Sequence, residues 1–443
     1  MVTLSATRRR LRPTGRCSRR GGLHLTIALL LSLIFWQTAR GQGVVRDSIS
    51  ATSSGRGGTN IAHNDNLTLL LDNPAGLAHL PQRERFDFGA DLLFTRLDYA
   101  DPWDETHAKP VPFALPQLAF AQRTANDRLT YGIGVFAPAG FGAHYHFHHL
   151  LYGLREYNSL GALLKILPAV AYRVDERFSI GATFGLGISH AQFDMPYNLQ
   201  SGCFAGLPAL VDMKATGVAP TWSVGAQYRI SEQTTVGLAY IAETRFRLKG
   251  DADIDVTGLG LPLLKAGYDA QVDLVWPASL GAGLTHQFND RHRISADVLW
   301  FDWSHAFDRL DMKLTDGSNP LFNFVLGNTV RDHLPLDWHD SIAARLGYEY
   351  FATPNDVLRC GYIYHKSPIP SSTLMPNLGG TLEHAVTLGY GHQWKKWRLD
   401  LAYQYSWAPA NHVGYSRVLG GDYDHSTFEA QAHWVFLTLS CGF

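Results

Sequence analysis

The stretch WRLDLAYQYSW, Trp397–Trp407, alternates between large apolar residues and residues that are polar or small. One face carries Trp397, Leu399, Leu401, Tyr403, Tyr405 and Trp407, and the other carries Arg398, Asp400, Ala402, Gln404 and Ser406. A period of two places successive side chains on opposite faces of an extended chain, whereas a helix repeats its apolar residues every three or four positions. The pattern therefore predicts a β-strand with one apolar face.

The same period returns along the chain, for example at Phe86, Phe88, Ala90, Leu92 and Phe94. Tight turns are predicted at 126–127, 175–176, 231–232, 289–290, 354–355 and 395–396. Longer loops are predicted near 100–112, 139–161, 194–214, 249–267, 304–336, 367–380 and 408–426. Short and long connections alternate, and together they join fourteen strands, most of them long enough to cross a bilayer at a tilt.

Regular alternation of short and long connections is typical of an outer-membrane barrel, which has short turns in the periplasm and long loops outside. Closure of the sheet also removes the free edges that hydrocarbon does not tolerate. The last strand ends at Phe443 with Val435, Leu437 and Leu439 in one register, which resembles the signal read by the outer-membrane assembly machinery. We expect an all-β fold, a fourteen-stranded antiparallel transmembrane β-barrel over residues 84–443.

Residues 1–41 are expected to be a cleaved signal peptide, with seven arginines between Arg8 and Arg20 and an apolar run over residues 25–36. This segment holds eight of the 38 basic residues and none of the 39 acidic ones, so the remaining chain has a formal charge of −9. A chain this acidic is a poor partner for nucleic acid, because phosphate binding needs clustered Lys and Arg. We expect no nucleic-acid partner.

The stretch DNPAGLAHL, residues 72–80, predicts a short helix with Asn as its cap and Pro at its first position. It ends a Gly-rich segment, residues 42–83, that precedes the first strand on the periplasmic side and is too short to make a core. The surface available to it is the barrel lumen. We therefore expect an N-terminal hatch, or plug.

At these motifs the chain resembles the long-chain fatty-acid and hydrocarbon transporters of outer membranes, the FadL/TodX type. The resemblance rests on SSGRGG (53–58), DNPAGLAHL, YGIGVFAPAGFGAHY (131–145) and SPIPSSTLMP (367–376), in that order. It implies a fourteen-stranded barrel with a hatch whose tip is Asn73, Pro74 and Ala75. It also implies passive inward passage of fatty acids or aromatic hydrocarbons, and a kink in the third strand between Phe136 and Gly140.

The kink has a physical basis in FAPAGFG, because Pro138 cannot donate to a strand ladder and Gly140 and Gly142 weaken it further. A gap in the wall at Phe136, Pro138 and Gly140 would let a solute leave sideways into the bilayer. In the alternative interpretation, Pro138 merely ends the third strand where a loop begins. Phe141, Tyr145 and Phe147 are expected to lie in that loop and to collect solute.

Several polar residues are weaker candidates. His144, His146, His148 and His149 have a spacing that suits a metal, but no Cys or carboxylate lies close by in sequence, so no metal is expected. Lys165, Arg155 and Arg359 either meet a fatty carboxylate or are lumen or loop charges paired with acidic neighbours. Neither a Gly-x-Ser-x-Gly elbow nor a His-Glu-x-x-His pair occurs, which argues against an enzyme.

The leading hypothesis is passive uptake of hydrophobic compounds, most of all long-chain fatty acids, through apolar pockets with hatch movement and lateral exit. The alternatives are an aromatic-hydrocarbon importer, a solute-selective aqueous porin, a barrel enzyme and an adhesive barrel. The expected partners are hydrophobic small molecules, outer-membrane lipid, lipopolysaccharide and the assembly machinery. We expect a monomer without a cofactor.

Overall fold

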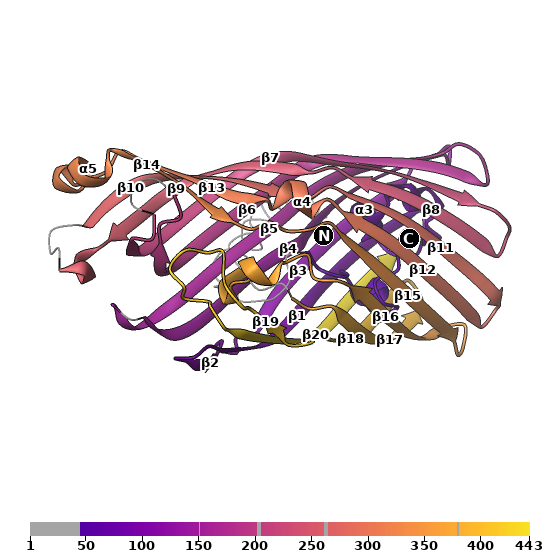
Figure 1. The fold of residues 1–443 in the computed structure, drawn as a ribbon. Coiled ribbons are helices and arrows are strands. Elements are labelled where there is room, and N and C mark those ends of the chain that lie inside the picture. The colour runs from indigo at the N-terminus through magenta and orange to yellow at the C-terminus, as the bar shows by residue number, and fades with distance from the viewer. Residues whose placement is uncertain (1–44, 150, 202–204, 261–264, 379–380) are drawn as a thin grey trace, which may run out of the picture. The chain divides into compact units, whose positions relative to one another are not determined.

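The computed structural model describes residues 45–149, 151–201, 205–260, 265–378 and 381–443. The expected signal peptide, 1–41, and the first three hatch residues lie outside these ranges. The described residues form one antiparallel sheet closed on itself around an N-terminal segment (Figure 1). Among them, no helix combines the length and the apolar character needed to cross a membrane.

The sheet contains twenty strand segments. They are β1 (Glu84–Ala100), β2 (Glu105–His107), β3 (Phe113–Arg123), β4 (Leu129–His149), β5 (Gly153–Arg173), β6 (Phe178–Asn198), β7 (Pro208–Arg229), β8 (Thr234–Ile241), β9 (Thr244–Asp255), β10 (Lys265–Trp276), β11 (Ser279–Asn289), β12 (His292–Phe301), β13 (Arg309–Thr315), β14 (Thr329–Pro335), β15 (Ser341–Phe351), β16 (Asp356–His365), β17 (His384–Trp394), β18 (Trp397–Trp407), β19 (Asn411–His412) and β20 (Thr427–Gly442). The short helices are α2 (Ala51–Gly55), α3 (Leu69–Asp72), η1 (Pro74–His79), η2 (Thr257–Leu259), α4 (Trp303–Ala306), α5 (Pro320–Leu326), η3 (Ser371–Thr373) and η4 (Pro376–Leu378).

These segments make fourteen wall strands. β2 and β19 are short segments outside the count of wall strands. Four wall strands are each divided into two segments by one interruption: β8 and β9, β10 and β11, β12 and β13, and β14 and β15. β1 pairs with β20 from Arg85 opposite Gly442 to Ala100 opposite Thr427, and with β3 on its other side, which closes the barrel. The predicted fourteen-stranded barrel is confirmed, and all six predicted tight turns join consecutive strands.

Three of the predicted long loops, 139–161, 194–214 and 304–336, contain substantial regular structure. The expected loop 139–161 is wrong, because β4 continues to His149 and β5 begins at Gly153. The expected loop 304–336 instead contains α4, β13, α5 and β14. The Gly and Pro residues at the start of 139–161 suggested a loop, but pairing between β4 and β5 holds this part of the chain extended.

The four interruptions lie on neighbouring wall strands, at residues 242–243, 277–278, 302–308 and 336–340. In Figure 1 they separate β8, β11, β12 and β15 from β9, β10, β13 and β14. Four buried aromatic side chains fill the space beside them. Phe307 lies 6.1 Å from Trp276, 5.1 Å from Trp303 and 4.6 Å from Trp338 between ring centroids. The wall is therefore packed by side chains where its hydrogen-bond ladder stops.

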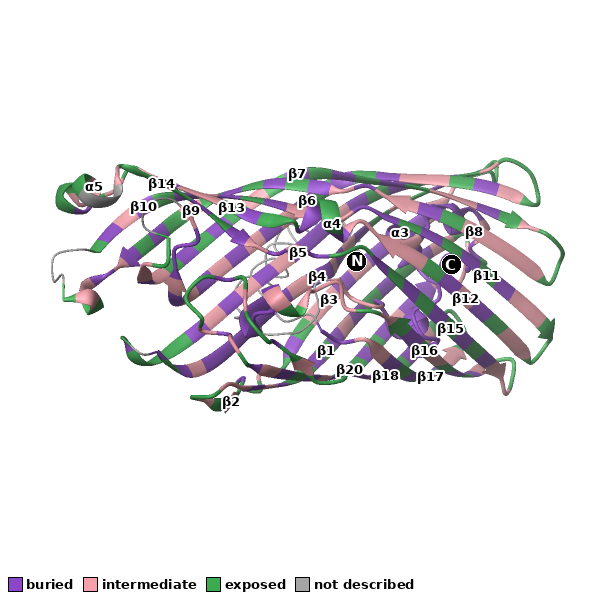
Figure 2. Ribbon diagram, viewed as in Figure 1, coloured by how far each residue is buried: buried purple, intermediate pink, exposed green. Residues whose placement is uncertain are grey.

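Exposed and buried residues alternate along many of the strands (Figure 2). The predicted apolar face of the first strand points outward, since Phe86, Phe88 and Phe94 are exposed. Its polar partners Arg85 and Asp87 point inward and are buried. An apolar exterior around a polar interior is the pattern of a transmembrane barrel.

Residues 45–83 fill the interior at the end of the barrel where the tight turns lie. The predicted cap is present: the Asn73 Oδ1 accepts a hydrogen bond from the Ala75 amide at 3.1 Å, and Pro74 begins η1. The Asn73 side-chain amide also donates to the Ile61 carbonyl at 2.7 Å. This segment packs against the wall through an apolar cluster that joins Leu70 and Leu77 to Phe136 and Leu167, as well as through polar and backbone groups.

Glycines on the wall allow this close approach. A Cβ added to Gly181 or Gly225 would overlap Pro74 and Asn73 respectively. At a second contact, a Cβ on Gly361 would overlap the amide of Gly57, and one on Gly347 would overlap the Arg56 carbonyl. The two N-terminal stretches SSGRGG and DNPAG thus each lie against glycines on adjacent strands.

A buried ion network also joins this segment to the wall. Arg56 contacts Asp65 at 2.8 Å, and Arg293 of β12 contacts the same carboxylate at 2.9 Å. Glu349 of β15 contacts Arg293 at 2.5 Å and Arg359 at 2.9 Å. Burial raises the pKa of Asp65, but Arg56 and Arg293 more than offset this and hold that pKa well below its usual range. The carboxylate remains charged within the barrel.

Gly361→Ala should destabilise the barrel by about 1–3 kcal/mol, because the new methyl group meets backbone, which cannot move aside as a side chain can. Urea unfolding of the detergent-solubilised protein, followed by tryptophan fluorescence, measures the change. Gly414→Ala is the control, since nothing lies within 4 Å of its Cβ, and it should stay within about 0.5 kcal/mol. Equal effects of the two substitutions would contradict the docking role of Gly361.

Candidate functional site

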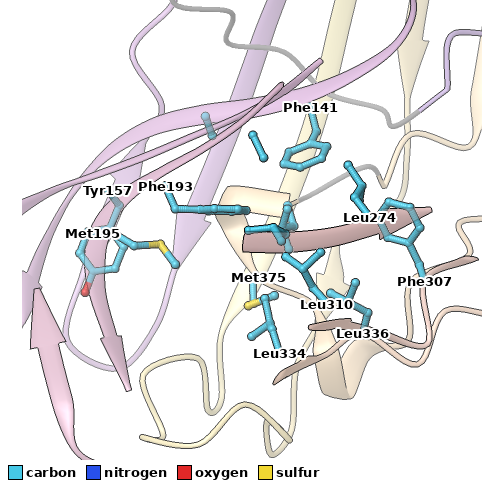
Figure 3. Packing of buried hydrophobic residues seen from close by; sticks show 14 of the residues in the cluster. Phe141, Tyr157, Phe193, Met195, Leu274, Phe307, Leu310, Leu334, Leu336 and Met375 are labelled. Atoms are coloured by element: carbon cyan, nitrogen blue, oxygen red, sulfur yellow. The ribbon is translucent and has the colours of Figure 1, made fainter. Parts of the chain in front are cut away.

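The lumen beyond the N-terminal segment is lined by apolar side chains. Phe141, Phe193, Leu274 and Leu310 come from four different strands and gather around one space together with Met375 (Figure 3). A water-filled porin has a polar interior, so this chamber suits a solute that leaves water. The apolar chamber is the central feature of the site.

An apolar pocket opens within this chamber between β6, β7, β9, β13 and β14. Its lining includes Phe193, Met195, Leu199, Val211, Met213, Ile254, Leu310, Met312, Leu314, Val330 and Leu334. Asp332 is its only charged residue, and its carboxylate accepts hydrogen bonds from the Tyr197 hydroxyl at 2.9 Å and the Gln200 amide at 3.0 Å. The pocket thus offers a solute almost nothing but hydrocarbon.

The connection between β16 and β17 folds into the barrel over this chamber. Leu374, Met375 and Leu378 are buried in the same apolar cluster. The Ser159 hydroxyl of β5 donates to the Asn377 carbonyl, and the Asn377 amide lies 2.7 Å from the sulfur of Met195. The Ser-Pro-Ile-Pro run therefore introduces a lid and not an extended surface loop.

A second cavity lies between the chamber and the N-terminal segment. Residues 45–49 form one side, and Leu163, Lys165, Trp276 and Phe301 of the wall contribute to the other. It reaches Pro138 and Ala139 of β4. The Asp72 carboxylate also lines it, and burial raises the pKa of Asp72 to about 6. We call this the inner cavity.

The pairing of β4 is irregular in the stretch Phe136–Gly140, where the sequence predicted a kink. The register between β4 and β5 shifts between Phe136 and Ala139. β4 pairs with β3 only up to Val135, so residues 113–117 of β3 have no partner on that side. Because β4 continues to His149, the alternative that Pro138 simply ends the strand is wrong.

The N-terminal segment covers the kink from inside. The Arg46 amide donates to the Pro138 carbonyl at 2.9 Å, and Val45 forms an antiparallel bridge with Ala139. The Arg46 guanidinium contacts Asp91 of β1 at 2.6 Å and lies 4.8 Å from the ring centre of Trp434. The N-terminal segment and the irregular part of β4 are therefore directly connected.

The three candidate cations have different surroundings. Arg359 is a structural charge, bonded to Glu349 at 2.9 Å and Asp400 at 2.7 Å. Arg155 is exposed at the outer end of β5. Lys165 is 6% exposed on the inward face, and among the described residues no ion pair or hydrogen bond of its ammonium is found. Of these three cations, Lys165 is the one that lines the inner cavity.

The predicted solute-collecting residues lie on strand β4 and not on a loop. Phe141, Tyr145 and Phe147 are buried and face inward beyond the kink. Phe147 packs edge-on against Tyr157, with 4.7 Å between ring centroids. Their aromatic character indicated a solute contact, but their position as part of the chamber wall depends on the register after the kink.

Sequence reasoning missed two features. The aromatic cluster at the wall interruptions, Trp276, Trp303, Phe307 and Trp338, comes from segments with no shared motif. Glu156 was missed because it stands ten residues after His146, although the two residues are directly paired across the β4–β5 hairpin. A correct register for that hairpin would have revealed it.

Comparison with known proteins agrees with this architecture. A Pseudomonas aeruginosa FadL homologue has a TM-score of 0.75 at 20% identity, covering 90% of this chain and 100% of its own. The Pseudomonas putida toluene transporter TodX has a TM-score of 0.74 at 21% identity, covering 91% and 100%. An outer membrane protein of Neisseria meningitidis serogroup B is 23% identical over 347 residues, covering 70% of this chain and 73% of the relative.

These structural likenesses show the same fold. Residues 31–443 match the family described as outer membrane protein transport protein (OMPP1/FadL/TodX), which is nearly the whole chain. The closed barrel, the kinked third strand and the buried N-terminal segment are in accord with that match. The chain belongs to the OMPP1/FadL/TodX family of outer membrane transport proteins.

Proposed function

We propose that this protein carries hydrophobic compounds with an anionic headgroup, long-chain fatty acids above all, passively inward across the outer membrane. The observation that carries this proposal is the apolar chamber followed by an inner cavity lined by Arg46, Arg345 and Lys165, of which Lys165 has neither an ion pair nor a hydrogen bond among the described residues. The chamber suits an acyl chain and the cation suits a carboxylate. The family consists of transport barrels and not enzymes, in line with the absence of catalytic motifs.

The chamber supplies the driving force for capture. Each methylene moved from water into an apolar site gains ~0.8 kcal/mol, so a fatty acyl chain gains on the order of 10 kcal/mol. Such a solute passes between successive apolar pockets more readily than along a water-filled channel. Release of the solute then requires a conformational change that weakens its binding. In this proposal the N-terminal segment undergoes that change.

Lys165 provides the basis for headgroup selection. A buried ammonium without a counter-ion is unfavourable, and an arriving carboxylate would relieve that cost while losing its own hydration. Arg46 lines the same cavity but is already neutralised by Asp91. A fatty acid with its head at Lys165 would extend its chain toward Leu163, Trp276 and the chamber.

The kink provides the exit in this proposal. The inner cavity reaches Pro138 and Ala139, where β4 has no pairing with β3 and instead contacts residues 45–46 of the described chain. Withdrawal of those residues would open the wall to the bilayer. A hydrophobic solute would then leave sideways, without crossing the ion network that holds the rest of the hatch.

Aromatic hydrocarbons are the second candidate substrates, because TodX is a toluene transporter and the cluster of Trp276, Trp303, Phe307 and Trp338 borders the cavities. A neutral hydrocarbon would make no use of Lys165. A solute-selective aqueous porin is disfavoured by the apolar chamber and by the buried segment that fills the barrel beyond it. The headgroup therefore decides between the two remaining substrates.

Lys165→Met should weaken binding of dodecanoate by about 10- to 100-fold, the effect of losing one charge-assisted hydrogen bond, and leave dodecanol unchanged. Displacement of a fluorescent fatty acid from the purified barrel measures both affinities. Lys214→Met, which removes an exposed cation from β7, is the control. An equal loss for acid and alcohol would show that Lys165 only supports the fold, and no loss for either would refute headgroup selection.

A disulfide between Val45→Cys and Ala139→Cys should stop uptake of a fatty acid by cells under oxidising conditions, and a reductant should restore it. Antiparallel bridge partners stand at a Cα separation that a disulfide spans. The native cysteines are first replaced by Ser. The pair His412→Cys and Thr427→Cys, joining β19 to β20, is the control and should leave uptake unchanged. Full uptake with the first disulfide formed would rule out exit through the kink.

A further inference from the structure

A group of metal-binding side chains lies on the outward face of the β4–β5 hairpin, away from the solute pathway. His144 and His146 stand two residues apart on β4, and Glu156 of β5 is paired directly with His146. The imidazole rings are stacked with 5.3 Å between their centroids. Two rigid, paired strands thus hold two nitrogens and one carboxylate together.

The spacing of the donor atoms fits a tetrahedral ion. The Glu156 Oε1 lies 3.4 Å from the His144 Nε2 and 3.3 Å from the His146 Nε2. Ligands bonded to zinc at 2.0–2.2 Å are about 3.3–3.6 Å apart when the coordination is tetrahedral. One atom from each of the three residues lies within 4.8 Å of the others. The three donors therefore need little movement to share one ion.

Lys109 shows that this position attracts a cation. Its ammonium lies 3.1 Å from the His144 Nε2 and 3.5 Å from Glu156, and the Lys109 amide donates to the His144 carbonyl at 2.9 Å. The lysine side chain is 45% exposed, so it can swing into solvent when an ion arrives. Lys109 is thus a competitor that a metal ion displaces, and not a barrier.

A second group, His63, Asp65 and Glu349, has similar spacing but cannot serve in the same way. Its carboxylates are already bonded to Arg56 and Arg293 inside the barrel. Displacing buried guanidinium groups would leave them without partners, which is strongly unfavourable. The hairpin group faces outward and has no such obstacle.

We propose that His144, His146 and Glu156 bind one divalent transition-metal ion of the zinc class. Three protein ligands leave the fourth position free, and it faces outward because the side chains of Glu156 and His146 are 51% and 38% exposed. The ion ties β4 to β5 just beyond the kink. This site is independent of solute uptake and would exist whatever the barrel transports.

Titration of the purified full chain, carrying no histidine tag, with Co²⁺ tests this site. The expected result is one Co²⁺ per chain with the visible absorption of tetrahedral cobalt, which Zn²⁺ abolishes. His146→Ala and Glu156→Gln should each weaken binding by more than about 100-fold, because loss of a ligand exceeds the effect of losing a supporting group. Lys109→Met should strengthen it.

His148→Ala is the matched control, because His148 lies on the same face of β4 but bonds to Asp104 at 3.1 Å instead of joining the group. It should bind Co²⁺ like the unchanged protein. A difference in gel mobility between unheated and heated samples verifies that each variant is a folded barrel. Absence of stoichiometric binding, or equal binding by Glu156→Gln and His148→Ala, would overturn the proposal.

Discussion

The structure depends on direct contact between the backbone of the N-terminal segment and the backbone of the barrel wall. Glycines opposite one another in the sheet, Gly181 with Gly225 and Gly347 with Gly361, make that contact possible. A side chain at any of these positions would separate the two layers. The buried Arg56–Asp65–Glu349 group then fixes the segment laterally, since breaking one partner would leave a charge unpaired in the interior.

This contact divides the barrel into two halves with different chemistry. One half is filled by residues 47–83, whose amides donate to wall carboxylates such as Asp87 and Asp297 and whose leucines form a smaller apolar cluster with the wall. The other half is apolar and closed by the lid at Leu374 and Met375. In our proposal, a hydrophobic solute that has entered the apolar half leaves the barrel where the two halves meet. The kink at Pro138 stands at that level, beside the inner cavity.

Local signals explain what the sequence could predict. Two-residue alternation, tight turns and the Asn73 cap each depend on neighbours in the chain, and all three are confirmed. The kink was also predictable, because Pro138 lacks a donor whatever surrounds it. Features that depend on register were not. Phe141, Tyr145 and Phe147 were assigned to a loop, and the pairing of Glu156 with His146 follows only from how β4 and β5 align. Likewise, nothing local distinguishes Lys165, without an ion-pair partner in the described chain, from Arg359, which has two.

The contact between residues 45–46 and β4 has an energetic consequence. Residues 45–46 satisfy the Pro138 carbonyl and place Arg46 against Asp91, so their withdrawal exposes one buried carbonyl and separates one ion pair. Each loss costs about 1–3 kcal/mol, which keeps the wall closed when no solute is present. A ligand shifts this balance only by binding the open state more tightly than the closed one. An anionic headgroup beside Lys165 and Arg46 meets that condition, because it competes with Asp91 for Arg46. In our proposal, the same charge that selects the solute therefore also loosens the segment that blocks its exit.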